Sequence, residues 1–308
     1  MKKVPTTDEI NSLFANGDPD LVWAEATAIV SRISAGYDYT LVKAVFDDVL
    51  RLFRGEYPGY TSIKTLYHDL PHTLDVFMCA VRLLHGVHLS GVQQNDECIT
   101  RVMIATLMHD VGYAQQLHEA NGTGAQFTQI HVRRGIAFMR NYFAADNLAP
   151  ALPDTLEPIM LSTDPVLTFS EINFPDARTR LLAQIVGTAD LLGQMADRSY
   201  LEKLLFLYLE FKEAHFGNYL STHDLLRQTK VFYGAAKEKL DNTYNGIYAC
   251  LALHFNDTMG VQSNYYLESI EKNIAYLTKV LELSEPEQLA MLKRSCIVAQ
   301  SKAIPAAD

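Results

Sequence analysis

Apolar residues recur at three- and four-residue steps along most of this chain. The clearest stretch, residues 41–53, places its apolar side chains at Leu41, Val42, Val45, Phe46, Val49, Leu50 and Phe53. The same spacing is found in residues 99–108, 181–192, 201–211 and 265–283. This spacing lines one face of a helix. Because alternating strand patterns are scarce, the sequence predicts an all-α fold.

The predicted helices are separated by short breaks. Glycine, proline and asparagine cluster at residues 55–59, 121–124, 148–154 and 303–308, and such clusters mark turns and loops. None is long or biased enough to be an interdomain linker. We therefore expect one structural domain, a helical bundle in which an N-terminal helical layer (1–60) and C-terminal helices (216–308) pack on a core formed by 61–215.

The composition excludes several classes of protein. The 308 residues are 48% hydrophobic and 20% charged, which favours a folded chain with a sizeable core over disorder. We expect no signal peptide, because the residues after Met1 lead directly into a polar stretch, and no stretch has the 18 or more apolar residues typical of a membrane span. The four cysteines show no CxxC spacing, so we expect a cytoplasmic protein without a membrane partner.

The formal net charge is −10 and there is no basic run, which argues against nucleic acid as a bulk partner. If the substrate carries phosphate, a local positive charge must offset this repulsion. A metal cluster would do so.

The first candidate group is the sequence YHDLPHTLDV at residues 67–76. Asp69 followed by a proline predicts a helix N-cap, which places His72 in the first turn and His68 just before it. The positive end of a helix favours a neutral His72 that can bind a metal. Taken alone, both histidines could equally be capping or hydrogen-bonded core residues.

The second group is IATLMHDVG at residues 104–112. An apolar helix leads directly into His109 and Asp110, so the carboxylate is predicted to be buried, where it needs a partner. The pair His223-Asp224 follows a polar stretch instead, and we interpret it as part of a helix start.

The third group is IVGTADLL at residues 185–192. Asp190 lies four residues after Val186 on the same apolar stripe. A carboxylate at such a position pairs with an arginine or binds a metal.

Together, His72, His109, Asp110 and Asp190 supply two imidazoles and two carboxylates, a ligand set that suits one or two divalent ions (Zn, Mn, Fe or Mg). This H…HD…D pattern resembles the HD superfamily of metal-dependent phosphohydrolases. Residues 67–76 resemble the YHN-x-x-H-A-x-D-V motif of the cyclic-nucleotide phosphodiesterase catalytic domain. Residues 161–164 (LSTD) resemble its LATD segment, and 188–191 (TADL) its C-A-D-L segment.

The resemblance implies a helical hydrolase that cleaves a phosphoester in a nucleotide-like small molecule with a metal-activated water. It implies that the four residues hold one ion, that Asp110 also bridges to a second ion, and that His68 is the general acid. His131, predicted in the first turn of another helix, resembles a histidine that binds the second metal or shapes the water network.

Two departures from the family leave the substrate open. The chain reads HDVGYA at 109–114 where the phosphodiesterases have HD-x-x-H-P-G, and Gln194 is too close to Asp190 to be their purine-reading glutamine. A phosphodiesterase is preferred. The alternatives are an HD phosphomonoesterase, a nucleoside-triphosphate hydrolase, and a non-catalytic metal-binding sensor or scaffold.

The sequence also suggests roles for several residues outside the candidate ligand set. Lys64, Tyr113, Gln115 and Gln116 are candidate substrate-side groups, as is the polar loop 117–129, for which a surface linker is the preferred interpretation. Arg133 and Arg134 are interpreted as solvated surface in preference to phosphate-binding residues. His254 is interpreted as a core histidine. The aromatic residues of 206–211 and 265–266 are interpreted as core or subunit-interface packing, which leaves a homodimer open.

Overall fold

The computed structural model describes residues 10, 13, 14, 17–119, 121–145, 149 and 151–303. The N-terminal stretch 1–9 and most of the break at 303–308 lie outside these residues. The described helices are α2 (Pro19–Ile33), α3 (Thr40–Arg54), α4 (Leu70–Leu89), α5 (Asp96–Met108), α6 (His131–Ala145), α7 (Leu152–Met160), α8 (Ala177–Ala196), α9 (Tyr200–Glu213), α10 (Thr222–Glu238), α11 (Leu251–Met259), α12 (Tyr265–Val280), α13 (Glu285–Met291) and α14 (Ile297–Ala303). The all-α prediction is confirmed. Within the described part of the chain, β pairing is limited to an isolated bridge between Tyr60 and Gln116.

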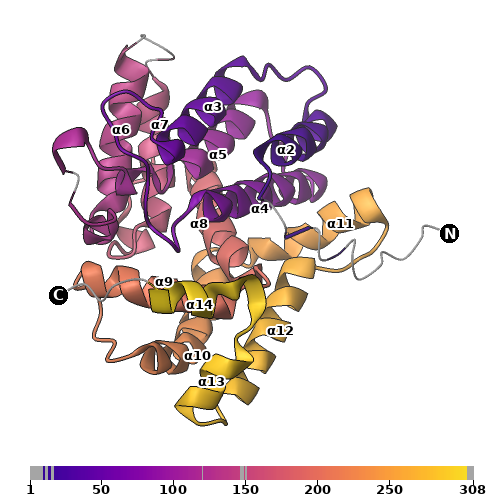
Figure 1. The fold of residues 1–308 in the computed structure, drawn as a ribbon. Coiled ribbons are helices and arrows are strands. Elements are labelled where there is room, and N and C mark those ends of the chain that lie inside the picture. Colours follow the sequence, from indigo (N-terminus) through magenta and orange to yellow (C-terminus); the bar gives the residue numbers. More distant parts are fainter. Residues whose placement is uncertain are drawn as a thin grey trace.

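Two long helices, α4 and α8, form the centre of the molecule and pack along each other. In α4, every residue from His72 to Val87 is buried, as expected for a helix that is apolar nearly all round. Helices α2, α5 and α11 cover α4, while α7 and α12 cover α8. Figure 1 shows α3, α5, α6 and α7 at one end of the molecule and α9, α10, α13 and α14 at the other, with α8 between them.

The strongest periodicities predict their helices to within a few residues. Residues 41–53 form α3, 99–108 form most of α5, and 181–192 lie inside α8. One hydrophobic core joins buried residues from α2 through α8 to α12. None of the described helices combines the length and apolarity needed to cross a bilayer.

One predicted break and one predicted helix extend further along the sequence than the structure shows. Helix α7 already begins at Leu152, with Pro153 in its first turn, so the break at 148–154 ends earlier than expected. Proline is tolerated there because the first N–H groups of a helix have no intrahelical partner. Helix α12 ends at Val280, three residues before the end of the predicted stretch.

Candidate metal centre

The start of α4 fixes the first histidine. Asp69 is the N-cap, and its side chain accepts a hydrogen bond of 2.8 Å from the backbone N–H of His72. Pro71 occupies the first turn, as the sequence predicts. The His72 ring is 4% exposed and is therefore held in the interior at the positive end of the helix.

The end of α5 fixes the second pair. His109 is the C-cap of α5, and its Nδ1 lies 2.7 Å from the carbonyl oxygen of Thr106. Because a carbonyl only accepts, Nδ1 carries the proton and Nε2 is left with a free lone pair. Asp110 follows directly, 2% exposed, so the buried carboxylate predicted from the sequence is present.

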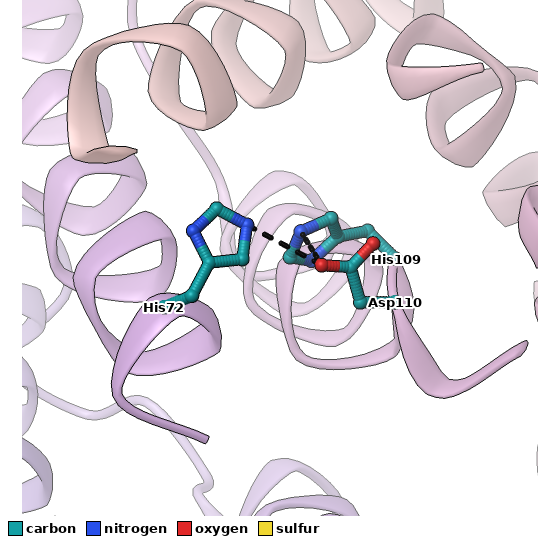
Figure 2. A group of neighbouring side chains, drawn as sticks. All are labelled: His72, His109 and Asp110. Carbon is teal, nitrogen blue, oxygen red and sulfur yellow. Dashed lines mark ion pairs between the residues drawn. The ribbon is translucent and has the colours of Figure 1, made fainter. Parts of the chain in front are cut away.

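Side chains from three helix segments meet at this point. The Nε2 atoms of His72 and His109 lie 3.3 Å and 3.1 Å from Oδ2 of Asp110. Figure 2 shows the two rings turned toward that carboxylate oxygen. Asp190, on α8, brings its Oδ1 within 3.7 Å of His72 Nε2 and 3.9 Å of His109 Nε2. Its side chain is 19% exposed, so it is less buried than the sequence predicts.

The group of His72, His109 and Asp110 could hold a metal ion, because their ligand atoms all lie within 4.8 Å of one another. Atoms bound at about 2.1 Å to one tetrahedral ion lie about 3.4 Å apart, close to these separations. His109 Nε2 and Asp110 Oδ2 are also buried without a hydrogen-bond partner. Such orphaned polar atoms are costly unless something else satisfies them.

The charges of the group are strongly coupled. Burial opposes a charge on Asp110, but His109 beside it outweighs this effect and holds the pKa of the carboxyl well below its usual range. Burial likewise opposes a charge on His109, but Asp110 raises the pKa of that ring to about 9. Asp110 is therefore ionised, and the ring beside it binds a proton unless another cation takes its place.

His131 approaches the same carboxylate from another direction. It is the first residue of α6, as predicted, and its Nδ1 lies 2.7 Å from the carbonyl oxygen of Thr128. This contact leaves its Nε2 free, 3.4 Å from Oδ1 of Asp110. The two oxygens of Asp110 therefore face different histidines.

Sequence reasoning missed the residue that positions His68. Glu210, on α9, is 3% exposed, and its Oε2 lies 2.6 Å from Nδ1 of His68. Its Oε1 accepts a hydrogen bond of 2.6 Å from the backbone N–H of Tyr67. The available signal was a carboxylate four residues after Phe206 on an apolar stripe, the same signal that identified Asp190.

Tyr113 packs against both His68 and His131, whose ring centroids lie 6.2 Å apart. Its ring stacks on His68 with centroids 4.7 Å apart and on His131 with centroids 4.5 Å apart. It follows the His109-Asp110 pair in a short 3₁₀ turn, η1 (Val111–Tyr113). The turn that ends α5 therefore also fixes the spacing of His68 and His131.

A cavity of about 410 Å³ opens onto this group, and His68, Asp110, His131 and Asp190 are among the residues that line it. Much of the remaining wall is apolar and comes from α9, α10 and the loop between them, including Leu204, Leu207, Phe211, Phe216, Leu225 and Phe232. The LSTD segment forms the 3₁₀ turn η4 (Leu161–Thr163) and its C-cap, and contributes Ser162, Thr163 and Asp164 to the lining. The cavity therefore offers both polar side chains and an apolar wall to a small molecule.

Only one of the four individually named candidate substrate-side residues lines the cavity. Tyr113 lines the cavity, whereas Lys64, Gln115 and Gln116 are not among its lining residues. Gln115 is fully buried, and its amide donates to the carbonyl oxygens of Glu119 and Asn121. Gln115 therefore has a structural role in the loop.

The surface interpretation of Arg134 is wrong, while that of Arg133 is confirmed at 68% side-chain exposure. The guanidinium of Arg134 donates to the carbonyl oxygens of Gly112 and Ala114 and to Glu119. It thereby holds the turn after Asp110 against α6. The sequence pattern around Arg134 could not predict this role, because the carbonyl groups that it binds lie about 20 residues earlier in the chain.

The remaining histidine interpretations are confirmed. His223-Asp224 lies in the first turn of α10, whose N-cap is Ser221. His254 is a core residue, 3% exposed, with its Nδ1 3.0 Å from Nδ1 of His85. Phe211 lines the cavity, whereas Tyr265 and Tyr266 are buried in the core.

Comparison with known proteins gives a partial family match. The chain is similar to the Npun_R2479-like family over residues 116–236, which is less than half of its length. The match includes His131, Asp190 and Glu210 and excludes His68 and the His109-Asp110 pair. No curated protein and no solved structure matches the chain.

Proposed function

We propose that this protein is a metal-dependent phosphohydrolase of the HD type that cleaves a phosphoester in a small, nucleotide-like molecule. The observation that carries the proposal is that the Nε2 atoms of His72 and His109 lie 3.1–3.9 Å from carboxylate oxygens of both Asp110 and Asp190. These residues are far apart in the sequence except for one adjacent pair. Two orphaned buried atoms at the centre of the group support a cation as the missing partner.

In this proposal the four residues hold one divalent ion, and Asp110 extends to a second site. Its Oδ2 faces His72 and His109 while its Oδ1 faces His131, an arrangement that a bridging carboxylate requires. The bound metal would activate a water molecule and stabilise charge on the phosphate oxygens. His131 is accordingly a ligand of the second ion or a member of the water network.

His68 is the proposed general acid. Although burial opposes its charge, the buried carboxylate of Glu210 raises the pKa of His68 above its ordinary value. A larger fraction of His68 is then protonated near neutral pH, ready to protonate the leaving oxygen. Because Glu210 engages Nδ1, Nε2 is the atom that transfers the proton. This pairing favours an enzyme over a metal-binding scaffold, which has no need of a proton donor.

The apolar wall of the cavity favours a phosphodiester or other ester with a bulky alcohol group over a bare sugar phosphate. Gln194 is already engaged, since Tyr67 donates to its Oε1 at 2.9 Å and its Nε2 donates to the Asp190 carbonyl oxygen at 3.1 Å. This engagement does not support a base-reading role for Gln194, so the proposal does not specify cyclic nucleotides.

Metal analysis of the purified protein, followed by hydrolysis of bis(p-nitrophenyl) phosphate and a set of cyclic and linear nucleotides, tests the proposal. Asp110→Ala should lose both the metal and the activity. Asp224→Ala is the control, because it changes the second His-Asp pair of the chain, which is not part of the candidate metal centre. This variant should keep both the metal and the activity. Full activity in Asp110→Ala, or a wild-type protein that binds no divalent ion, would overturn the proposal.

A further inference from the structure

Lys239 provides the single lysine or arginine side chain among the described residues that line the cavity. Three carboxylates, Asp110, Asp164 and Asp190, share this lining. In a chain with a net charge of −10, an anionic ligand at this site would meet repulsion unless cations face it. Lys239 is therefore a candidate for the cation that faces an anionic ligand in this cavity.

In the described part of the chain, no ion pair within 4.0 Å joins Lys239 to a carboxylate. Asp190 and Asp164 attract its ammonium group from further away. The Asp164 carboxylate takes part in other contacts, because its Oδ1 accepts hydrogen bonds from the backbone N–H groups of Val166 and Leu167. Burial lowers the pKa of Lys239, although the two aspartates oppose this effect. The ammonium group is thus partly desolvated without a direct anionic partner.

Tyr244 connects Lys239 to α8, the helix that carries Asp190. Lys239 begins a π-helical turn, η6 (Lys239–Thr243). Such turns are rare in proteins, and those that occur are often found at functional sites. Its Nζ lies 5.3 Å from the ring centroid of Tyr244. A Cβ added to Gly187 would lie 2.4 Å from the Tyr244 hydroxyl, so this tyrosine packs closely on α8, three residues before Asp190.

We propose that Lys239 is the anion-binding side chain of the cavity and holds a non-bridging oxygen of the substrate phosphate. This inference rests on the proposed function and narrows its substrate class to esters that carry a negative charge at phosphorus. The lysine binds the ground-state anion and positions it; His68 and the metal ligands carry out the chemistry. Neutral phosphate triesters and carboxylic esters gain nothing from this contact.

A binding measurement on the wild-type protein tests Lys239 without relying on turnover. Acetylation of lysines is followed by mass spectrometry in the metal-loaded protein, with and without inorganic phosphate at constant ionic strength. At phosphate ten times its dissociation constant, Lys239 should be modified about tenfold more slowly. Lys237 is the internal reference, because it is exposed and pairs with Asp241 at 2.8 Å, and its rate should not change. Equal rates for Lys239 with and without phosphate overturn the inference.

Kinetics of matched variants gives a second test. Lys239→Gln should raise KM for an anionic ester, and weaken inhibition by phosphate, by about 10-fold to 100-fold, with little change in kcat. Lys239→Arg should restore most of the affinity, and Lys237→Gln should behave as wild type. An unchanged KM in a folded Lys239→Gln protein overturns the inference while the phosphohydrolase proposal stands. If no ester is hydrolysed, the proposed function fails and the acetylation result still decides the role of Lys239.

Discussion

The ring of His68 and the carboxylate of Glu210 lie 2.6 Å apart, although 142 residues separate them in the sequence. The second oxygen of Glu210 accepts the backbone N–H of Tyr67, the residue next to that histidine. A single buried carboxylate therefore fixes both the backbone before α4 and the orientation of the His68 ring. We infer that α9, which supplies Glu210, positions the proposed proton donor at the residues that α4, α5 and α8 bring together.

Glu210→Gln should separate the charge of this carboxylate from its shape. Glutamine can still accept a hydrogen bond, but without the charge the burial of His68 lowers its pKa. Because a general acid must be protonated, the loss of activity at high pH should then begin at a lower pH than in the wild type. The maximal rate should fall by about 10²-fold.

A pH–rate profile of kcat/KM measures this shift. Glu213→Gln, one turn further along α9, is the matched control, because Glu213 instead accepts hydrogen bonds from Thr123. A Glu210→Gln profile whose high-pH limb coincides with that of the wild type would contradict the proposed link.

His68→Ala should retain the metal and lose activity according to the leaving group. An alkyl ester, whose leaving oxygen needs a proton, should be hydrolysed about 10²–10⁴-fold more slowly. An activated aryl ester leaves without protonation, so its loss should be much smaller. Steady-state rates on the two kinds of ester, with metal analysis of the same sample, make the comparison. Equal losses on both esters rule out the acid role.

Metal binding should release a proton from His109. In the metal-free protein Asp110 raises the pKa of this ring to about 9, whereas a metal ligand must be a neutral imidazole. At pH values below about 9 the apparent affinity should therefore rise by up to about tenfold per pH unit, and it should level off above that value.

Calorimetric titration with Zn²⁺ or Mn²⁺ in buffers of different ionisation enthalpy counts the protons released. We expect a release close to one proton per ion from His109 near neutral pH. An affinity that does not change between neutral pH and pH 9, with no proton release, would show that the His109-Asp110 pair does not hold the ion.

The parts of this site that depend on local sequence were predictable. The N-cap at Asp69, the helix leading into Asp110 and the stripe that carries Asp190 each follow from residues within two turns of one another. Glu210 and Arg134 were missed because their partners, the ring of His68 and the carbonyl groups of Gly112 and Ala114, come together only in the folded chain. Period and capping patterns carry no information about such contacts.

The close approach of η1 to α6 makes Gly112 the most sensitive glycine of the site. A Cβ at this position would lie 1.8 Å from the carbonyl oxygen of His131 and 2.7 Å from the backbone nitrogen of Gly135, so backbone must move to admit it. Gly112→Ala should therefore destabilise the protein by about 3 kcal/mol. It should also weaken metal binding, because the displaced segment carries His131.

Gly234 is the matched control, since it lies inside α10 with no atom within 4 Å of an added Cβ. Gly234→Ala should stabilise the protein by about 0.5–1 kcal/mol through its higher helix propensity. Urea denaturation of the three proteins, with metal titration of each, compares the outcomes. If Gly112→Ala is as stable as the wild type, the turn after Asp110 and α6 can separate at little cost, and the tight packing that fixes Asp110 relative to His131 is not required.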